Sequence, residues 1–329
     1  MARIKYSVVV PVYKNEASIQ RLVQVLIDMN NKLAGQLEAV FVVDGSPDNS
    51  FLILREALGN AELTAQLIAH SRNFGSFAAI RTGLAAAKGQ KFTVMAADLQ
   101  EPPELILSML DALERDECDV AIGARSSRAD SGVNKLVSGL FWGLYRRLVM
   151  RDIPSGGVDV FGCNEAFRDQ LLKLEEASSS LVALIFWLGF RRKFIYYDRL
   201  PRAEGKSAWS LKKKIDYMLD SIFAFTDLPI KVLLATGTTG IVISFILAVG
   251  VIVGRLAGWI TVPGYAATML VLLFFGSINI LGFGIVGAYV WRAYENSKSR
   301  PLAVVARCYK FDTSNCSDKQ EHEYQNLTS

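Results

Sequence analysis

Three clusters of acidic and amide side chains follow predicted β-strands in the N-terminal part of the chain. They begin at Pro11, Asp44 and Asp98 and read PVYKNE, DGSPDNS and DLQ. Carboxylate and amide oxygens hydrogen-bond a base and a ribose, and they hold a divalent cation against a diphosphate. Each cluster alone is also ordinary turn or helix-capping chemistry. Their shared position after strands favours a nucleotide-binding site, and none of them belongs to a glycine-rich GxGxxG or GxxxxGK[ST] loop.

Short apolar runs alternate with helix-like patterns around these clusters. Repeated β–α units build a mainly parallel sheet covered on both faces, and such sheets bind ligands beyond the carboxyl ends of their strands. The predicted fold class is therefore α/β, with the three clusters at one sheet edge. The predicted strands are residues 6–10, 37–43, 65–69, 92–97 and 119–122, and the predicted helices are residues 17–30, 50–58, 76–87 and 103–115.

The composition predicts a membrane part. Of 329 residues, 51% are hydrophobic and 21% are charged, and the mean hydropathy is +0.26. Residues 232–254 and 266–290 contain no Asp, Glu, Lys or Arg, and each exceeds the roughly 20 residues that a spanning helix needs. They predict two transmembrane helices, with a pair of buried helices in a soluble core as the alternative. Basic residues flank the pair on both outer sides, which places both flanks in the cytoplasm: Lys212, Lys213, Lys214, Lys231, Arg292, Lys298, Arg300, Arg307 and Lys310.

Cysteine and histidine usage narrows the compartment and the metal. Four cysteines without CxxC spacing indicate reduced thiols. Only two histidines are present, so a metal site has to use oxygen ligands, which favours Mg²⁺ or Mn²⁺ over Zn²⁺. The net charge is +4, and the basic residues gather near the predicted spans, so anionic membrane lipid is expected as a partner rather than nucleic acid. The N-terminus lacks the apolar core of a signal peptide, so residues 1–230 are expected to stay in the cytoplasm.

Five stretches resemble a known family. The chain is similar, over residues 5–305, to the polyprenyl-phosphate glycosyltransferases of glycosyltransferase family 2, relatives of dolichyl-phosphate mannose synthase and of the bactoprenol glucosyltransferases. As a set the five stretches are highly specific. They are SVVVPVYKNE, VVDGSPDNS, HSRNFGSFAAIRTGL, AADLQEPP and RAEGKSAWS.

The resemblance implies a GT-A fold and a set of donor-binding residues. The metal ligands of Mg²⁺ or Mn²⁺ would be Asp98 and Gln100. The chain departs from the family pattern twice, because Ala96 replaces the first Asp of the usual Asp-x-Asp and Val43 replaces the first Asp of Asp-Asp-Gly-Ser. Activity is expected despite these departures, because the other motifs are intact. The donor-binding residues implied are Pro11, Tyr13, Glu16, Asp44, Asn73, Ala97, Asp98, Arg202 and Lys206.

The implied reaction is attack of a lipid-linked phosphate on the anomeric carbon of a nucleotide sugar, with inversion. Asp159 aligns with the residue usually named the catalytic base, and Asp98 and Arg202 complete the catalytic set. A phosphate monoester is already ionised at neutral pH, so Asp159 would orient the acceptor or the sugar as much as accept a proton. Arg125 and Arg128 would bind the acceptor phosphate, with solvated surface charge as the alternative. A buried structural role is the alternative for Asp159.

Two basic amphipathic helices, residues 136–149 and 211–225, are expected to hold the active site at the membrane surface. For the first, packing on the sheet is the alternative, and residues 181–190 are either interfacial or core. The predicted domains are a cytoplasmic GT-A catalytic domain (1–210), an amphipathic juxtamembrane helix (211–230), a transmembrane hairpin (231–291), a cytoplasmic segment (292–311) and a disordered tail (312–329).

The predicted function is the transfer of a sugar, with glucose from UDP-glucose as the expected donor, to undecaprenyl phosphate at the cytoplasmic face. The protein is then an integral inner-membrane enzyme with both termini in the cytoplasm, and the family suggests a homo-oligomer such as a tetramer. Two alternatives remain at this point. One is a nucleotide-sugar-binding scaffold that lost catalysis with Ala96, and the other is a polysaccharide synthase, for which QxxRW and enough spans for a pore are missing.

Overall fold

A computed structural model describes most of the chain and divides it into two compact units. The described residues are 4–125, 143, 154, 158–176, 180–200, 221–223, 225–257, 264–312 and 321–322. The sheet unit comprises Met1–Glu176, Ser180–Lys213 and Pro301–Ser329, and the helix-pair unit comprises Ala177–Ser179 and Lys214–Arg300. The predicted helix at 136–149 and most of the one at 211–225 lie outside the described residues.

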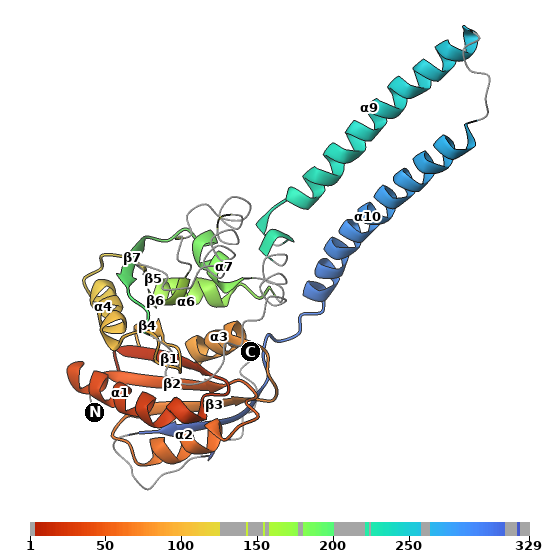
Figure 1. The fold of residues 1–329 in the computed structure, drawn as a ribbon. Helices are drawn as coiled ribbons and strands as arrows, with labels where there is room; N and C mark the ends of the chain where they lie inside the picture. Colours follow the sequence, from red (N-terminus) through yellow and green to blue (C-terminus); the bar gives the residue numbers. More distant parts are fainter. Residues whose placement is uncertain are drawn as a thin grey trace. The chain divides into compact units, whose positions relative to one another are not determined.

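The sheet unit is built on a sheet with the strand order β7-β5-β6-β4-β1-β2-β3-β8-β9 (Figure 1). Its strands are β1 (Tyr6–Val12), β2 (Leu37–Val43), β3 (Thr64–His70), β4 (Lys91–Val94), β5 (Val120–Arg125), β6 (Val158–Asn164), β7 (Arg192–Tyr197), β8 (Val305–Phe311) and β9 (Glu321–His322). Its helices are η1 (Glu16–Ser18), α1 (Ile19–Lys32), α2 (Ser50–Gly59), α3 (Ser76–Ala86), α4 (Pro103–Glu114), α6 (Glu165–Leu172) and α7 (Leu181–Trp187).

The centre of the sheet is parallel, as predicted. β1 pairs in parallel with β2 and β4, and β2 pairs in parallel with β3. Every residue of β2 is buried, which explains why its sequence is a nearly continuous apolar run rather than an alternating one. α1 and α2 pack on the face that carries Val8 and Val10, and α3 packs on the opposite face against Val9. The prediction of a mainly parallel α/β sheet is confirmed.

Two strands, β6 and β8, run opposite to the parallel centre of the sheet. β6 lies antiparallel between β4 and β5, and β8 lies antiparallel beside β3. β9, which pairs with β8, falls inside the tail that was predicted to be disordered. These strands were not predicted, because each is fixed by a partner far away in the sequence rather than by its own pattern.

The structure shortens the strand predicted at 92–97 and decides between the two alternatives for residues 181–190. The strand predicted at 92–97 ends at Val94, because the following residues form a turn in which the Leu99 amide donates to the Ala96 carbonyl and Leu99 has φ of 55°. The sequence allows residues 181–190 to be either interfacial or part of the core. α7 occupies Leu181–Trp187, and its first six residues are buried, so this segment belongs to the core of the sheet unit.

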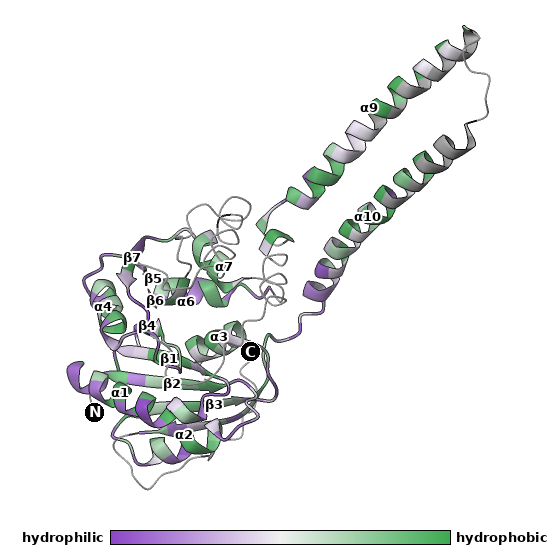
Figure 2. Cartoon of the chain, in the orientation of Figure 1, coloured by the Kyte–Doolittle hydropathy of each residue, from purple (hydrophilic) through white to green (hydrophobic). Residues whose placement is uncertain are grey.

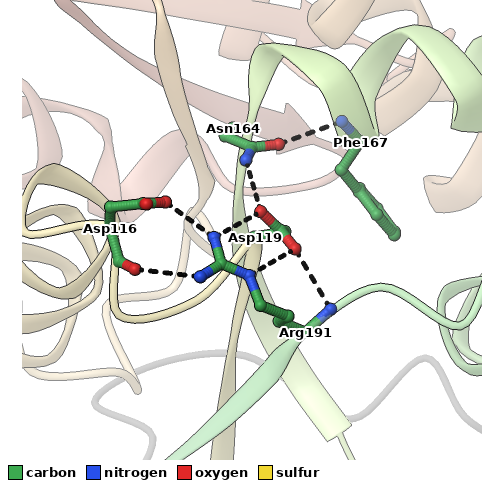
Figure 3. A network of polar contacts seen from close by, with 5 residues as sticks. All are labelled: Asp116, Asp119, Asn164, Phe167 and Arg191. Carbon is green, nitrogen blue, oxygen red and sulfur yellow. Dashed lines mark hydrogen bonds and ion pairs between the residues drawn. The ribbon is translucent and has the colours of Figure 1, made fainter.

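A polar network joins β5, β6 and β7 at the edge where β5 and β7 begin (Figure 3). The Arg191 guanidinium donates to both carboxylate oxygens of Asp119, at 3.0 and 3.1 Å, and to the Asp116 carboxylate at 2.7 Å. The Asn164 amide donates to the same Asp119 at 2.9 Å, and its oxygen accepts from the Phe167 amide at the start of α6. The hydrogen bonds from Arg191 lower the pKa of Asp119.

The helix-pair unit contains two long apolar helices, α9 (Leu228–Leu256) and α10 (Tyr265–Ser297). Figure 2 shows hydrophobic residues along both, whereas the last turn of α10 is hydrophilic. Phe245, Ile280 and Phe283 are each at least 70% exposed, so these helices present apolar surface that nothing in the described residues covers. Among the described residues one segment, Phe274–Ser297 of α10, is long and apolar enough to cross a membrane.

Replacing Gly83 tests the packing of α3 on the sheet. A Cβ at Gly83 would lie 2.3 Å from Val9 Cγ1, in a sheet position that is fully buried. We expect Gly83→Ala to lower the free energy of unfolding by about 1–3 kcal/mol through overpacking. Gly59→Ala, at a helix end with nothing within 4 Å, is the control and should be neutral or slightly stabilising. Urea unfolding followed by circular dichroism measures both, and equal stabilities would contradict the packing.

The Arg191 network should make stability depend on pH. Because the pKa of Asp119 is lowered, its charge stabilises the fold above its ordinary pKa of about 4, and this contribution is lost as pH falls through the lowered value. Arg191→Gln should therefore lower the melting temperature at pH 6, and the difference from the wild type should shrink below pH 4. Arg115→Gln, which breaks an exposed pair with Asp111, is the control with little effect. A difference that is constant down to pH 3 would contradict the electrostatic account.

Candidate active site

The predicted site lies where β4, β1, β2 and β3 end side by side. These four strands are parallel neighbours, so the loops that follow them meet at one edge of the sheet (Figure 1). The loops comprise residues 13–15, 44–49, 71–75 and 95–102. They contain the three polar clusters of the sequence, which the structure therefore brings together.

The loops after β1 and β2 are held together by hydrogen bonds. The Lys14 amide donates to Ser46 Oγ at 2.8 Å, and the Asn49 amide donates to the Glu16 carboxylate at 3.0 Å. Asp48 accepts from the Ser46 hydroxyl at 2.6 Å and from the Glu16 amide at 3.3 Å. Burial raises the pKa of Asp48, but these hydrogen bonds outweigh burial, and the pKa is lowered. Glu16, predicted to bind the donor, thus also fixes the loop beside it.

Ser18 connects this pair of loops to the turn that carries Asp98. Its hydroxyl lies 2.8 Å from the Ala97 carbonyl and 3.0 Å from the Asn15 carbonyl. Ala97 is buried, whereas Asp98 is half-buried at the tip of the turn. The turn therefore has a fixed backbone, and the Oδ1 atom of Asp98 is buried in it.

Asp44 is more deeply buried than a nucleotide ligand is expected to be. It is 2% exposed, and its Oδ1 accepts from the Phe74 amide at 2.8 Å and its Oδ2 from the Gly75 amide at 2.7 Å. His70 Nδ1 lies 2.8 Å from the same Oδ1. Burial raises the pKa of Asp44, but the hydrogen bonds from His70 and the two amides lower it below its ordinary value. Asp44 is therefore ionised at neutral pH, and His70 Nδ1 carries a proton that it donates to it.

Gln100 is held by the segment that follows β7. Arg199 Nη2 lies 2.5 Å from Gln100 Oε1, and the Leu200 amide donates to the Gln100 carbonyl at 2.9 Å. The amide oxygen predicted to bind a metal is thus occupied by a guanidinium. A cation that binds this oxygen would lie next to the positive charge of Arg199, which opposes its binding unless Arg199 moves away.

The remaining predicted residues are distributed around this edge. Tyr13 and Asn73 are exposed on loops at the edge, and Pro11 is in β1. Arg125 ends β5, and Asp159 is near the start of β6, which runs antiparallel to β4 and so begins toward the carboxyl end of β4. Asp159 stands at a register shift between β5 and β6. Arg128, Arg202 and Lys206 lie outside the described residues.

Three residues that sequence reasoning missed contribute to this edge: Ser18, His70 and Arg199. Ser18 precedes α1 and reads as an ordinary helix start, and His70 ends a buried strand. Arg199 stands three residues before the RAEGKSAWS stretch. This proximity to a predicted donor-binding motif is the signal that could have identified Arg199.

The oxygen ligands predicted in the turn after β4 suit a hard divalent cation. Asp98 offers a carboxylate and Gln100 an amide oxygen, and Mg²⁺ is commonly held by one or two protein ligands together with substrate phosphates and water. Within the described ranges, no group of three or more His, Cys, Asp or Glu side chains is placed to bind a metal. The phosphates of a donor would therefore have to complete the coordination shell. The residues fit such an ion, and their role as ligands stays a prediction.

A separate cavity of about 610 Å³ lies between α4 and β7. Its charged lining alternates in sign, with Asp111 and Glu117 beside Arg115 and Lys193. None of the three polar clusters lines it, so we place the chemistry at the strand ends rather than in this cavity.

Known proteins with similar sequences agree with this architecture. Residues 7–174 match the model of the family described as "Glycosyl transferase family 2". A Synechocystis protein described as "Uncharacterized glycosyltransferase sll0501" is 31% identical over 304 residues, which are 92% of this chain and 95% of that protein. The undecaprenyl-phosphate 4-deoxy-4-formamido-L-arabinose transferase of Proteus mirabilis is 30% identical, and the bactoprenol glucosyl transferase of Shigella phage SfV is 26% identical. These two alignments cover 90% and 92% of this chain and 91% and 98% of the relatives, respectively.

Among solved structures, a glucosyl-3-phosphoglycerate synthase from Mycobacterium tuberculosis is 16% identical with a TM-score of 0.48, covering 68% of this chain and 78% of that one. The assignment of this chain rests instead on its strand order and on the family match. The strand order and the joined loops define an α/β protein whose polar residues gather at the carboxyl ends of its parallel strands. The chain belongs to glycosyl transferase family 2, and it is a glycosyltransferase with a GT-A-like α/β fold.

Proposed function

We propose that the protein transfers a sugar from a nucleoside diphosphate donor to a polyprenyl phosphate at a membrane surface. The observation that carries the proposal is the joined strand edge with the half-buried Asp98 in the turn after β4, in a chain where two long apolar helices follow β7 in the sequence. Two relatives named for undecaprenyl-phosphate and bactoprenol substrates align over at least 90% of this chain, so the similarity extends through both helices. UDP-glucose is the donor and undecaprenyl phosphate the acceptor that we favour.

The donor is proposed to bind across the loops after β1, β2 and β3. Tyr13 offers an exposed aromatic face for the base, and the exposed amide of Asn73 offers hydrogen bonds to the base or ribose. The diphosphate then lies beside the turn at Asp98. Arg202 and Lys206 are proposed to approach its oxygens from the segment that follows Arg199, which already contacts this turn through Gln100.

Asp98 and Gln100 are proposed to hold Mg²⁺ or Mn²⁺ against the diphosphate. Such an ion supplies neutralisation of the negative charge that develops on the departing nucleoside diphosphate. Because Ala96 replaces one carboxylate of the usual Asp-x-Asp pattern, Asp98 is the one that remains of that pattern, and the metal affinity should depend strongly on the bound donor. The fixed backbone at Ala97 keeps Asp98 in place before the donor arrives.

The acceptor needs alignment more than deprotonation. The second pKa of a phosphate monoester is about 6, so its oxygen is already anionic at neutral pH. Asp159, at the register shift between β5 and β6, is proposed to orient the acceptor or the sugar for in-line attack with inversion. Arg125 and Arg128 are proposed to bind the acceptor phosphate through paired N–H groups of their guanidinium side chains. Their positive charge would offset the repulsion between the acceptor phosphate and the diphosphate of the nucleotide sugar.

The membrane part of the proposal rests on the two long helices. α9 and α10 span 29 and 33 residues and expose large apolar side chains, and water-exposed apolar surface of this extent marks a membrane or protein contact. We propose that both cross the inner membrane, with the sheet unit on the cytoplasmic side. The thiols of Cys118, Cys163 and Cys308 are buried and are not in a disulfide, which agrees with a reducing compartment.

The activity can be tested with purified protein in detergent, UDP-glucose, Mg²⁺ and undecaprenyl phosphate. We expect a lipid-linked glucose, and we expect Asp98→Asn to lower kcat/KM by at least about 100-fold because the charge facing the metal and diphosphate is lost. Asp111→Asn, an exposed aspartate on α4, is the matched control and should retain activity. Chelation of the metal should abolish turnover, and added Mn²⁺ should restore it.

The outcomes separate the alternatives. A wild-type protein that binds UDP-glucose without forming product would favour a binding scaffold, and a long sugar polymer would favour a polysaccharide synthase. A lipid-linked product formed from another nucleotide sugar, and not from UDP-glucose, would support the proposed reaction and change only the identity of the sugar donor.

The membrane proposal predicts how the protein fractionates. After expression it should remain in the membrane pellet through an alkaline carbonate wash and be released by detergent, because two apolar helices anchor it. Release of the full chain by carbonate would contradict the spanning helices.

A further inference from the structure

We propose that His70 is a positioning residue for the donor: through Asp44 it fixes the loop at residues 71–75 in the shape that binds the nucleoside diphosphate. The inference rests on the proposed function and assigns a task to a side chain that the proposed chemistry does not use. Its basis is a continuous series of contacts from α3, through His70 and Asp44, to the loop.

His70 is fixed on both sides of its ring. It is 4% exposed, its Nδ1 lies 2.8 Å from Asp44 Oδ1, and its Nε2 lies 3.0 Å from the Thr82 hydroxyl on α3. The edge of its ring also packs against Phe74, with centroids 5.6 Å apart and planes at 89°. Both ring nitrogens are therefore paired, and the imidazole has one orientation.

Asp44 passes this constraint to the loop. Its two carboxylate oxygens accept from the amides of Phe74 and Gly75, at the point where α3 begins. Gly75 has φ of 100°, and a glycine backbone is flexible because it has no Cβ. The hydrogen bonds to Asp44 therefore fix its conformation. Without the proton from His70 Nδ1, one lone pair of a buried carboxylate would lose its partner, which carries a large desolvation cost.

The backbone of the loop is also pressed against the neighbouring turn. A Cβ at Gly45 would lie 2.3 Å from the Arg72 carbonyl carbon and 2.4 Å from the Asn73 nitrogen, so the two main chains touch. Asp44 holds the loop at this short separation through its hydrogen bonds to the Phe74 and Gly75 amides. A small shift of the loop would open a gap here and move Asn73.

The surface that results carries the donor-recognition groups. Arg72 and Asn73 are exposed, and the Arg72 guanidinium stacks 4.2 Å from the centre of the Phe74 ring. A guanidinium and a carboxamide held side by side suit a base edge and a phosphate of one nucleotide. His70 contacts Phe74 and Asp44, which fix Arg72 and Asn73, yet His70 itself is too buried to touch the donor. Its loss should therefore weaken donor binding and leave the acceptor untouched.

The test uses the full chain in detergent and measures UDP binding with Mn²⁺ by calorimetry, together with the KM values for UDP-glucose and undecaprenyl phosphate. His70→Ala should weaken UDP binding and raise the donor KM by at least about tenfold, with kcat and the acceptor KM changed less than about threefold. His70→Asn, whose amide can replace Nδ1 as the donor to Asp44, should recover much of the affinity. Thr82→Val, which removes the outer contact alone, should have a smaller effect than His70→Ala.

A loss of stability alone has to be distinguished from this role. Arg191→Gln weakens the fold where β5 and β7 begin, whereas the proposed site lies where the parallel strands end. This variant should therefore bind UDP with the affinity of the wild type even where its melting temperature is lowered. Equal UDP affinities for His70→Ala, His70→Asn and the wild type would overturn the inference while leaving the proposed function intact. A wild-type protein that binds no UDP would overturn the proposed function and, with it, the inference.

Discussion

The structure depends on one constraint: four parallel strands end at the same edge, and the polar groups of the loops that follow have to satisfy one another where water is excluded. Asp44 meets this constraint most completely, because its buried carboxylate accepts from two loop amides and from His70. Ser18 does the same between the loop after β1 and the turn after β4. A buried unpaired acceptor costs about 1–3 kcal/mol, so these bonds determine the loop shapes strongly.

This constraint divides the polar residues of the edge into two kinds. Asp44, Asp48 and Ser18 form hydrogen bonds that fix the loops, whereas Tyr13 and Asn73 are exposed. A site of this kind is rigid before its substrate arrives, which reduces the entropy lost on binding and favours a defined geometry for group transfer. Val43 and Ala96 stand where the family pattern has carboxylates, so in the proposed mechanism the metal and the diphosphate depend on Asp98.

The parts of the fold that the sequence predicted well are those whose environment is written in the residues themselves. The strand at 37–43 was predicted with its observed limits, because burial on both faces requires a continuous apolar run. β8 was missed because its exposed and buried residues follow no strict alternation, and its partner β3 lies more than 200 residues away. The three clusters were brought together as predicted, but the burial of Asp44 was not foreseen, because it depends on His70, 26 residues further along the chain. Likewise nothing in DLQ indicates that Arg199 contacts Gln100.

The most direct test of the account is a structure of the full chain with UDP and Mn²⁺ in a membrane mimic. The account predicts Mn²⁺ within bonding distance of an Asp98 oxygen and of the diphosphate, with the uracil over Tyr13 and beside the loop at residues 71–75. Gln100 should then have exchanged Arg199 for the ion. A nucleotide bound in the cavity between α4 and β7, or a diphosphate held away from Asp98, would contradict the central claim.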